Sequence, residues 1–440
     1  MDILIKAGQL LLSLSILVII HELGHFTFAK LFKTRVEKFY LFFDAWFSLF
    51  KFKRGETEYG IGWIPLGGYV KISGMIDESM DKEQMALPPQ DYEFRSKTSW
   101  QRLLIMIGGV LFNFILAIII YIGVLFVWGE KYLPAENVKY GIMCDSLAYD
   151  MGLKDGDKIT QVNGKEIKNF KEIVPKILLE EPQSITIVRN GETMNLPLDN
   201  KSIAKIIKHG RPFFDARIPF IAAAFTKDSP AKAAGMQVND KIIAIDTIRT
   251  EFFDEVKTQI VKYKGKEVSM TVVRNGLEKN LKVKISKEGT IGVAPDSRLD
   301  SFFDLEKKEY TIVESVPAGF EKGYNEVGDY LKQFKLLFTP ETEAYKSLGG
   351  FIAIGNIFPA EFDWYAFWMM TALLSIMLGV VNILPIPALD GGHVMFLFYE
   401  IITGRKPSDK FMEYAQITGM VLLLGLLLFA NGNDIIKLFK

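Results

Sequence analysis

Two histidines and a glutamate lie close together in an apolar run near the start of the chain, in VIIHELGHFTF (18–28). On a helix, His21 and His25 would be neighbours on one face, about 5–6 Å apart at their Cβ atoms. Two imidazoles so placed can fill two corners of a tetrahedral zinc site. Glu22 is rotated by about 100° from that face, so it can act as a general base on water that zinc activates. This spacing is the H-E-x-x-H pattern of zinc proteases.

A structural alternative is that both histidines are buried and hydrogen-bonded to neighbouring helices. Three polar groups in one apolar helix would then cost several kcal/mol to desolvate without a shared task. The metal interpretation is therefore favoured. It requires a third protein ligand from elsewhere in the chain, and one open position for catalysis.

The third ligand is predicted in NILPIPALDGGHV (382–394), where Asp390 is the only acid. Pro385 and Pro387 break a helix there, so Asp390 can turn inward on irregular backbone that protein surrounds. His393 is an alternative ligand, although a capping or supporting role is favoured for it. The alternative for Asp390 is a helix cap at the membrane interface.

The composition indicates a membrane protein of several domains. The 440 residues carry no net charge, so no basic surface points to nucleic acid. The single cysteine, Cys144, excludes an internal disulfide framework. About 20 apolar residues cross a bilayer. Four runs of that kind lie at about 8–32, 103–128, 364–389 and 414–431.

The first run could instead be a cleaved signal peptide. Its start, MDILIK, has no positive n-region, and no A-x-A-like cleavage site follows the apolar part. A retained helix is therefore favoured. Lysines and arginines are concentrated in 30–102 and in GRKPSDK (404–410), which predicts that these connections are cytoplasmic. Both termini and the long segment 130–362 would then lie outside.

The outer segment contains an internal repeat. Residues 146–164 resemble 229–247, and SITIVRNGE (184–192) resembles SMTVVRNGLE (269–278), a spacing of about 83 to 85 residues. Each copy shows β-branched strands, Asn-Gly turns and an intervening helix, and the two resemble a tandem pair of PDZ domains. Such domains capture an extended peptide at a sheet edge. Alternatively, the copies are spacers or gates without a peptide ligand.

Three further segments have recognisable patterns. TEYGIGWIPLGGYVKISGM (57–75) alternates apolar and polar residues, which predicts a β-hairpin or curled edge strands at the membrane interface. The polar stretch 77–98 is predicted to be an exposed loop. Residues 316–338 have the apolar spacing of an amphipathic helix that lies along the outer membrane surface.

These patterns together predict a multi-pass α-helical membrane protein with four transmembrane helices. A cytoplasmic membrane-associated β-hairpin region and two α+β PDZ domains, inserted between helices 2 and 3, complete the predicted fold. The predicted segments are transmembrane helix 1 (1–33), the β loop (34–100), transmembrane helix 2 (101–130), the PDZ domains (131–206 and 213–298), the amphipathic helix (310–340), and transmembrane helices 3 (362–402) and 4 (411–433).

HELGH in the first helix, together with NILPIPALDGG in a late one, resembles the site-2 proteases. The resemblance covers nearly the whole chain, and the PDZ-like copies place it in the bacterial branch of that family. It extends to GGVLFNF (108–114) and IGWIPLGGYVKISGM (61–75). GGFIAIG (349–355) occupies the place of a Gly-Pro-Ile-Gly motif and departs from it.

The resemblance implies a Zn²⁺-dependent intramembrane endopeptidase of the bacterial inner membrane, with its active site near the cytoplasmic face. Its substrates would be single-span membrane proteins, such as anti-sigma factors already trimmed outside in envelope stress signalling, or remnant signal peptides. The PDZ pair would bind peptides or exclude bulky outer domains. The implied residues are zinc ligands His21, His25 and Asp390, the base Glu22, and substrate-binding Asn382, Gly67, Gly68, Tyr69 and Val70.

Two other classes of function fit parts of the pattern. A membrane-bound PDZ scaffold or chaperone could hold a structural zinc, if His393 and Asp390 both closed the site. Glu22 beside the histidine pair disfavours this class, because a structural site needs no base. A metal transporter would require several polar residues that line a path across the bilayer, and the second and fourth apolar runs lack such a series.

Overall fold

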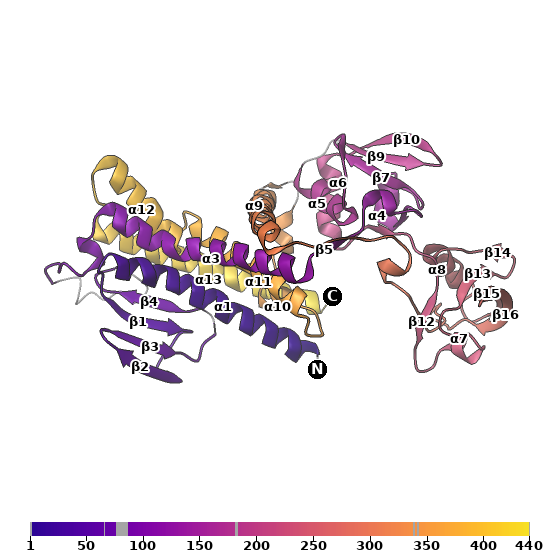
Figure 1. Ribbon diagram of the computed structural model, residues 1–440, viewed down its shortest axis with the longest axis horizontal. Coiled ribbons are helices and arrows are strands. Elements are labelled where there is room, and N and C mark those ends of the chain that lie inside the picture. Colours follow the sequence, from indigo (N-terminus) through magenta and orange to yellow (C-terminus); the bar gives the residue numbers. More distant parts are fainter. Residues whose placement is uncertain are drawn as a thin grey trace. The chain divides into compact units, whose positions relative to one another are not determined.

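The computed structural model describes residues 2–65, 67–75, 87–180, 184–337, 339–340 and 343–439. The chain forms two compact units (Figure 1). The first, here called the helical unit, comprises Met1–Gly129, Glu309–Lys335 and Leu348–Lys440; the second, the repeat unit, comprises Glu130–Lys308 and Leu336–Ser347.

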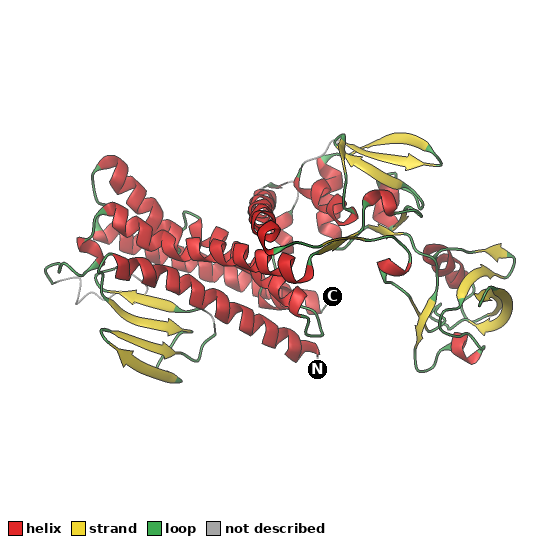
Figure 2. Cartoon of the chain, viewed as in Figure 1, coloured by secondary structure: helices red, strands yellow, loops and turns green. Residues whose placement is uncertain are grey.

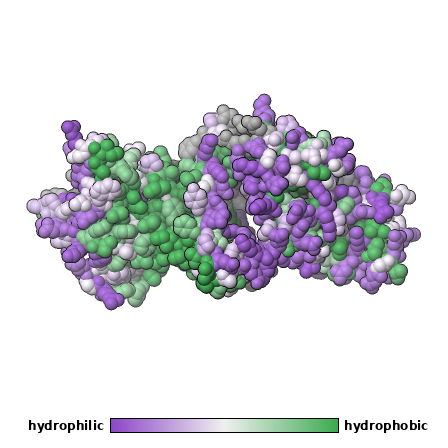
Figure 3. Space-filling model, turned by 45° about the horizontal axis from the view of Figure 1, so that its top comes forward, coloured by the Kyte–Doolittle hydropathy of each residue, from purple (hydrophilic) through white to green (hydrophobic). Residues whose placement is uncertain are grey.

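Four helices in the described part of the helical unit are long and apolar enough to span a membrane. They are α1 (Asp2–Leu31), α3 (Ser99–Trp128), α11 (Trp364–Ile383) and α13 (Asp409–Leu438). Apolar residues form a broad band over the surface of this unit (Figure 3). Large apolar side chains of these helices, such as Ile119 and Leu428, are exposed, as expected of helices that face acyl chains. The chain is therefore a multi-pass membrane protein.

The predicted third helix, 362–402, is divided in the structure. α11 ends at Ile383, and α12 (Asp390–Thr403) begins after a connection that contains Pro385 and Pro387. Neither proline can donate a backbone hydrogen bond, so the helix cannot continue through them. Asp390 is thereby the first residue of a new helix.

A four-stranded sheet lies beside α1 (Figure 1), with strand order β2-β3-β1-β4. Its strands are β1 (Val36–Leu41), β2 (Phe50–Arg54), β3 (Thr57–Ile61) and β4 (Tyr69–Ile72). Of the two arrangements predicted for 57–75, a hairpin within the segment is wrong, whereas β4 at its end is an edge strand. β3 runs parallel to β1 and β4 runs antiparallel to the other edge of β1, so β1 separates the two. The hairpin of this region instead joins β2 to β3.

The other two predicted segments of the helical unit extend into residues that the structure leaves undescribed. Of the loop 77–98, residues 77–86 lie outside the described residues, and the remainder contains a 3₁₀ turn, Phe94–Ser96. The helix predicted at 310–340 is α9 (Ile312–Leu337), and Phe338 is outside the description.

Helix α9 has one buried face of small residues and one exposed apolar face. Ser315, Gly319 and Gly323 are buried, and a Cβ atom on Gly319 would lie 2.7 Å from the backbone nitrogen of Ile122, so α9 packs closely on α3. A second face is exposed, and its large apolar side chains are Val313, Val316, Phe320, Tyr324 and Leu331. Small residues every four positions allow the close approach, as in other membrane helix pairs.

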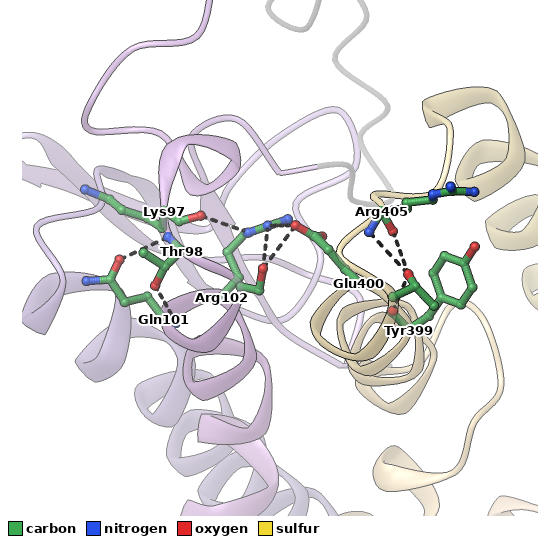
Figure 4. A network of polar contacts seen from close by, with 9 residues as sticks. Lys97, Thr98, Gln101, Arg102, Tyr399, Glu400 and Arg405 are labelled. Carbon is green, nitrogen blue, oxygen red and sulfur yellow. Dashed lines mark hydrogen bonds and ion pairs between the residues drawn. The ribbon is translucent and has the colours of Figure 1, made fainter.

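A buried ion pair joins α3 to α12. The Arg102 guanidinium, on a residue that is 7% exposed, points toward Glu400 at 2.5 Å (Figure 4). Arg102 also donates to the carbonyl of Lys97 at 3.1 Å, and the Ser99 hydroxyl donates to Glu400 at 3.0 Å. These contacts satisfy both charges and fix α12 against the start of α3.

Replacing Glu400 by Leu is expected to lower the free energy of unfolding by about 3–5 kcal/mol, because it leaves a buried guanidinium without its counterion. The measurement is thermal or denaturant unfolding of the full chain in detergent. The control is Asp329→Asn, which breaks the exposed Lys332–Asp329 pair and should cost less than about 1 kcal/mol. Equal effects of the two variants would contradict a structural role for the Arg102–Glu400 pair.

The repeat unit contains two copies of one α+β pattern, seen as two groups of strands in Figure 2. Their central sheets have orders β10-β9-β7-β8 and β14-β13-β15-β16. The first copy comprises β6 (Ile142–Cys144), α4 (Ser146–Asp150), β7 (Lys158–Val162), β8 (Lys165–Glu166), α5 (Ile173–Leu179), β9 (Ser184–Arg189), β10 (Glu192–Pro197), α6 (Asn200–His209) and β11 (Phe214–Ala216). The second comprises β12 (Ala222–Phe225), α7 (Pro230–Ala233), β13 (Lys241–Ile245), β14 (Ile248–Arg249), α8 (Phe253–Lys262), β15 (Glu267–Arg274), β16 (Leu277–Lys284) and β17 (Val293–Pro295).

The same polar contact recurs in both copies. Arg189 binds buried Asp157 through two bonds of 2.8 Å, and Arg274 binds buried Asp240 at 2.7 and 2.6 Å. In the second copy, burial alone would raise the pKa of Asp240, but the hydrogen bond from Arg274 lowers it overall. The spacing of the partners, 83 and 85 residues, matches the sequence repeat.

The boundary between the copies differs from the predicted one at 206–213. Phe213 and Phe214 belong to the first core, and β11 closes that copy by pairing with β6. Arg217 follows, and it binds Asp254 of α8 at 2.7 Å. A strand pair, β5 (Glu130–Tyr132) with β18 (Glu306–Lys308), holds together the two chain segments at the ends of the repeat region.

Candidate metal centre

Three side chains from two distant segments converge in the helical unit. Nε2 of His21 lies 3.2 Å from Nε2 of His25, and Oδ2 of Asp390 lies 3.1 and 3.3 Å from these two nitrogens. Zinc bonds of about 2.0–2.1 Å in a tetrahedron place ligand atoms about 3.3 Å apart. Oδ2 of Asp390 is also buried. The two nitrogens and the oxygen therefore fit three corners of a zinc site.

Glycines let α1 approach α3 at the level of the histidines. A Cβ atom on Gly24 would lie 2.1 Å from the carbonyl oxygen of Gly108, which no side chain could tolerate. A Cβ atom on Gly109 would lie 2.5 Å from Nε2 of His25 and 2.7 Å from Cε1 of His21. The space between the helices is thus sized for the two imidazoles.

The connection before α12 brings Asp390 to the histidines. A Cβ atom on Gly391 would lie 2.0 Å from the carbonyl oxygen of Leu384, so the chain turns tightly there. α13 supports the same connection: Gln416 accepts a hydrogen bond from the Ala388 amide at 3.2 Å. A Cβ atom on Gly419 of α13 would lie 1.8 Å from the carbonyl oxygen of Pro387, so only glycine fits there. Asp390 is therefore fixed by packing on both sides.

The second nitrogen of each imidazole meets a group on α3. Nδ1 of His25 lies 2.8 Å from the carbonyl oxygen of Ile105, and Nδ1 of His21 lies 3.1 Å from Nδ2 of Asn113. A carbonyl oxygen only accepts hydrogen bonds, so Nδ1 of His25 donates and its Nε2 presents a lone pair to the site. Such contacts orient a metal-binding histidine.

A cavity of about 530 Å³ opens at these residues. It is lined by both histidines, Asp390, Glu22, His393 and one edge of the sheet. Glu22 faces this space next to β4, since a Cβ atom on Gly68 would lie 3.6 Å from Cγ of Glu22. A carboxylate, three possible metal ligands and a strand edge thus share one cavity.

Three of the four loop residues predicted to bind substrate, Gly68, Tyr69 and Val70, line this cavity, whereas Gly67 only borders the strand. Gly67 has φ +145°, which favours glycine. The pKa of Tyr69 is raised, first by burial and second by the hydrogen bond of 2.8 Å that its hydroxyl donates to Asp44. The hydroxyl therefore stays protonated and can act as a donor. β4 pairs only with β1 among the described strands, so its other edge is open.

Asn382 lies near the metal site and outside the cavity lining. Its Nδ2 is 3.5 Å from Nε2 of His21. Asn382 is on the last turn of α11, one residue before the helix ends at Ile383. The structure thus brings the three predicted ligands together with Glu22, Asn382 and the strand segment in one region.

Replacing Gly68 by Ala is expected to lower kcat/KM for cleavage by at least about tenfold while zinc stays bound. The new Cβ atom would lie 2.6 Å from the carbonyl oxygen of Tyr40 and from Cγ1 of Val18, so β4 must move. The matched control is Gly8→Ala on α1, where the new Cβ atom would meet no other atom within 4 Å. Wild-type kinetics for Gly68→Ala would contradict a role for β4 in binding substrate.

The groups that hold the ligands in place had no role predicted from the sequence. They are the carbonyl of Ile105, the Asn113 amide and the Gln416 side chain. Asn113 carried a signal, because an amide in an apolar run is costly unless it has a partner. The carbonyl of Ile105 carried none, since every residue has one.

The family of membrane proteases predicted from the sequence is confirmed by comparison with known proteins. The model of peptidase family M50 matches residues 9–426. A relative named "Regulator of sigma E protease" from Haemophilus influenzae is 29% identical and matches 100% of both chains. A "Putative zinc metalloprotease" from Borreliella burgdorferi is 29% identical, with 98% of each chain covered.

These matches cover the whole predicted arrangement, from the histidine pair to Asp390 and beyond. They show that the protein is a protease of the site-2 type and that its cofactor is zinc. This chain therefore belongs to peptidase family M50, the zinc metalloproteases of the site-2 type.

Proposed function

We propose that this protease cuts single-span membrane proteins inside their transmembrane segments. One observation carries the proposal: Glu22, the three candidate ligands and the open edge of β4 line a single cavity beside the C-terminal half of α1, a helix long and apolar enough to span a membrane. A scaffold or chaperone with a structural zinc would not need a cavity of about 530 Å³ at the ion.

A substrate helix must unwind locally before it can be cut, because its carbonyls are engaged in its own hydrogen bonds. Unpaired backbone groups cost several kcal/mol each in lipid, so the enzyme must supply replacement partners. The open edge of β4, from Gly68 to Ile72, can pair with an extended segment. The Asn382 amide, near His21, can hold one further backbone group.

His21, His25 and Asp390 would hold the zinc ion, which supplies a Lewis acid to the scissile carbonyl when bound. Glu22 would take a proton from the attacking water and pass it to the departing amine. The C–N bond then breaks, and the water supplies one oxygen of the new carboxylate and the proton that the amine gains.

The distribution of lysine and arginine supports an inner-membrane protein with the site near the cytoplasmic face and with both termini and the repeat unit outside. The two copies, with their Asn-Gly turns and sheet edges, would act as PDZ domains. They would bind peptides or exclude substrates with bulky outer domains. Anti-sigma factors already trimmed outside, or remnant signal peptides, meet that requirement.

A purified single-span helix, incubated with the full chain in lipid nanodiscs, tests this function. Cleavage is expected to stop after treatment with a zinc chelator and to return when Zn²⁺ is added back. Mass spectrometry of the products should place the cut within the apolar segment. Cleavage that survives chelation, or a cut only outside the apolar segment, would refute the proposal.

A further inference from the structure

Asn113 is a fully buried polar side chain next to the metal centre. It lies in the middle of apolar helix α3, is 0% exposed, and its Nδ2 is 3.1 Å from Nδ1 of His21. Its Oδ1 is also buried and has no hydrogen-bond partner among the described residues. A buried amide oxygen that makes no hydrogen bond is destabilising, so it requires an explanation.

The orientation of the His21 ring explains why the Asn113 oxygen is placed there. Its Nε2 faces Asp390 at 3.1 Å, whereas its Nδ1 faces Asn113. If Nε2 binds zinc, as the proposed function requires, the ring proton must be on Nδ1. Nδ1 is then a donor, and of the two ends of the amide only the oxygen can accept its proton. A half-turn of the amide about its last bond brings Oδ1 to that position.

We propose that Asn113 is a positioning residue whose side-chain oxygen accepts the Nδ1–H of His21. This contact holds Nε2 of His21 toward the metal. The carbonyl of Ile105 performs the same task for His25, at 2.8 Å from its Nδ1. Helix α3 thus contributes no ligand and yet fixes both imidazoles of α1, which the close approach at Gly24 and Gly108 makes possible.

The proposal distinguishes an acceptor from a donor at position 113. Asn113→Leu removes the acceptor and is expected to weaken zinc binding by about 10–100-fold. Asn113→Asp keeps an acceptor and loses the donor, so zinc affinity should remain near the wild-type value. Ser375→Ala is the matched control, because Ser375 donates only to the backbone carbonyl of Asn113, at 2.8 Å.

Zinc affinity is measured on the full chain in detergent by competition with a chromophoric chelator, using monodisperse protein. Wild-type affinity in Asn113→Leu, or equal losses in the Leu and Asp variants, would overturn the proposal. If the Leu variant does not fold, the Asp variant decides: retained zinc supports an acceptor role, and lost zinc overturns it.

His25→Ala and Asp390→Ala, measured in parallel, separate this inference from the proposed function on which it rests. Loss of zinc in both, with wild-type affinity in Asn113→Leu, overturns only the role of Asn113. Wild-type affinity in all three variants overturns the zinc site itself.

Discussion

Replacing Glu22 by Gln is expected to reduce the rate of cleavage by about 10²–10⁴-fold, the usual contribution of a positioned general base. Gln has nearly the same shape, so the packing against Gly68 and the cavity should survive. Its amide cannot take a proton from water at neutral pH. The measurement is kcat on a single-span helix substrate in nanodiscs.

Zinc content is the control for this variant. Glu22 lies outside the group of three candidate ligands, so Glu22→Gln should bind as much zinc as the wild type. Unreduced cleavage would remove Glu22 from the mechanism. A loss of zinc together with activity would instead make Glu22 a ligand, and the assignment of Asp390 would then fail.

Replacing Gly109 by Ala is expected to weaken zinc binding by about 10–100-fold, with a matching loss of cleavage at limiting zinc. The new methyl group would lie 2.5 Å from Nε2 of His25 and 2.8 Å from Nε2 of His21. Both ligand nitrogens must then move, and a misplacement near 1 Å is costly at a catalytic centre.

Gly123→Ala provides the comparison, since Gly123 lies on the same helix and a Cβ atom there meets nothing within 4 Å. Zinc affinity and thermal stability should match the wild type in that variant, which separates steric pressure on the ligands from general effects on α3. If Gly109→Ala binds zinc as the wild type does, the imidazoles are not confined by α3.

Features with a strong local signal could be predicted from the sequence. The second and fourth apolar runs, predicted as helices 101–130 and 411–433, are α3 (Ser99–Trp128) and α13 (Asp409–Leu438). Uncharged runs of that length have few alternatives to a helix. The break between α11 and α12 followed from two prolines. The convergence of His21, His25 and Asp390 followed from the chemistry that a paired-histidine site requires.

Features that depend on contacts between distant segments could not be predicted. A hairpin within 57–75 was one of two predicted arrangements, but β1, which precedes the segment, lies between β3 and β4. Alternation of residues identifies strands without identifying their partners. The support of His21 by Asn113 depends on the rotation of α3 about its axis, which the packing at Gly24 and Gly108 sets.

X-ray absorption at the zinc edge, on the purified full chain, tests the central claim most directly. We predict two imidazole nitrogens and a carboxylate oxygen at about 2.0–2.2 Å from the zinc ion, with one further light atom and no sulfur. Asp390→Ala should lose the carboxylate contribution and most of its zinc. An unchanged spectrum and undiminished zinc in that variant would contradict the claim that Asp390 and the two histidines hold one ion.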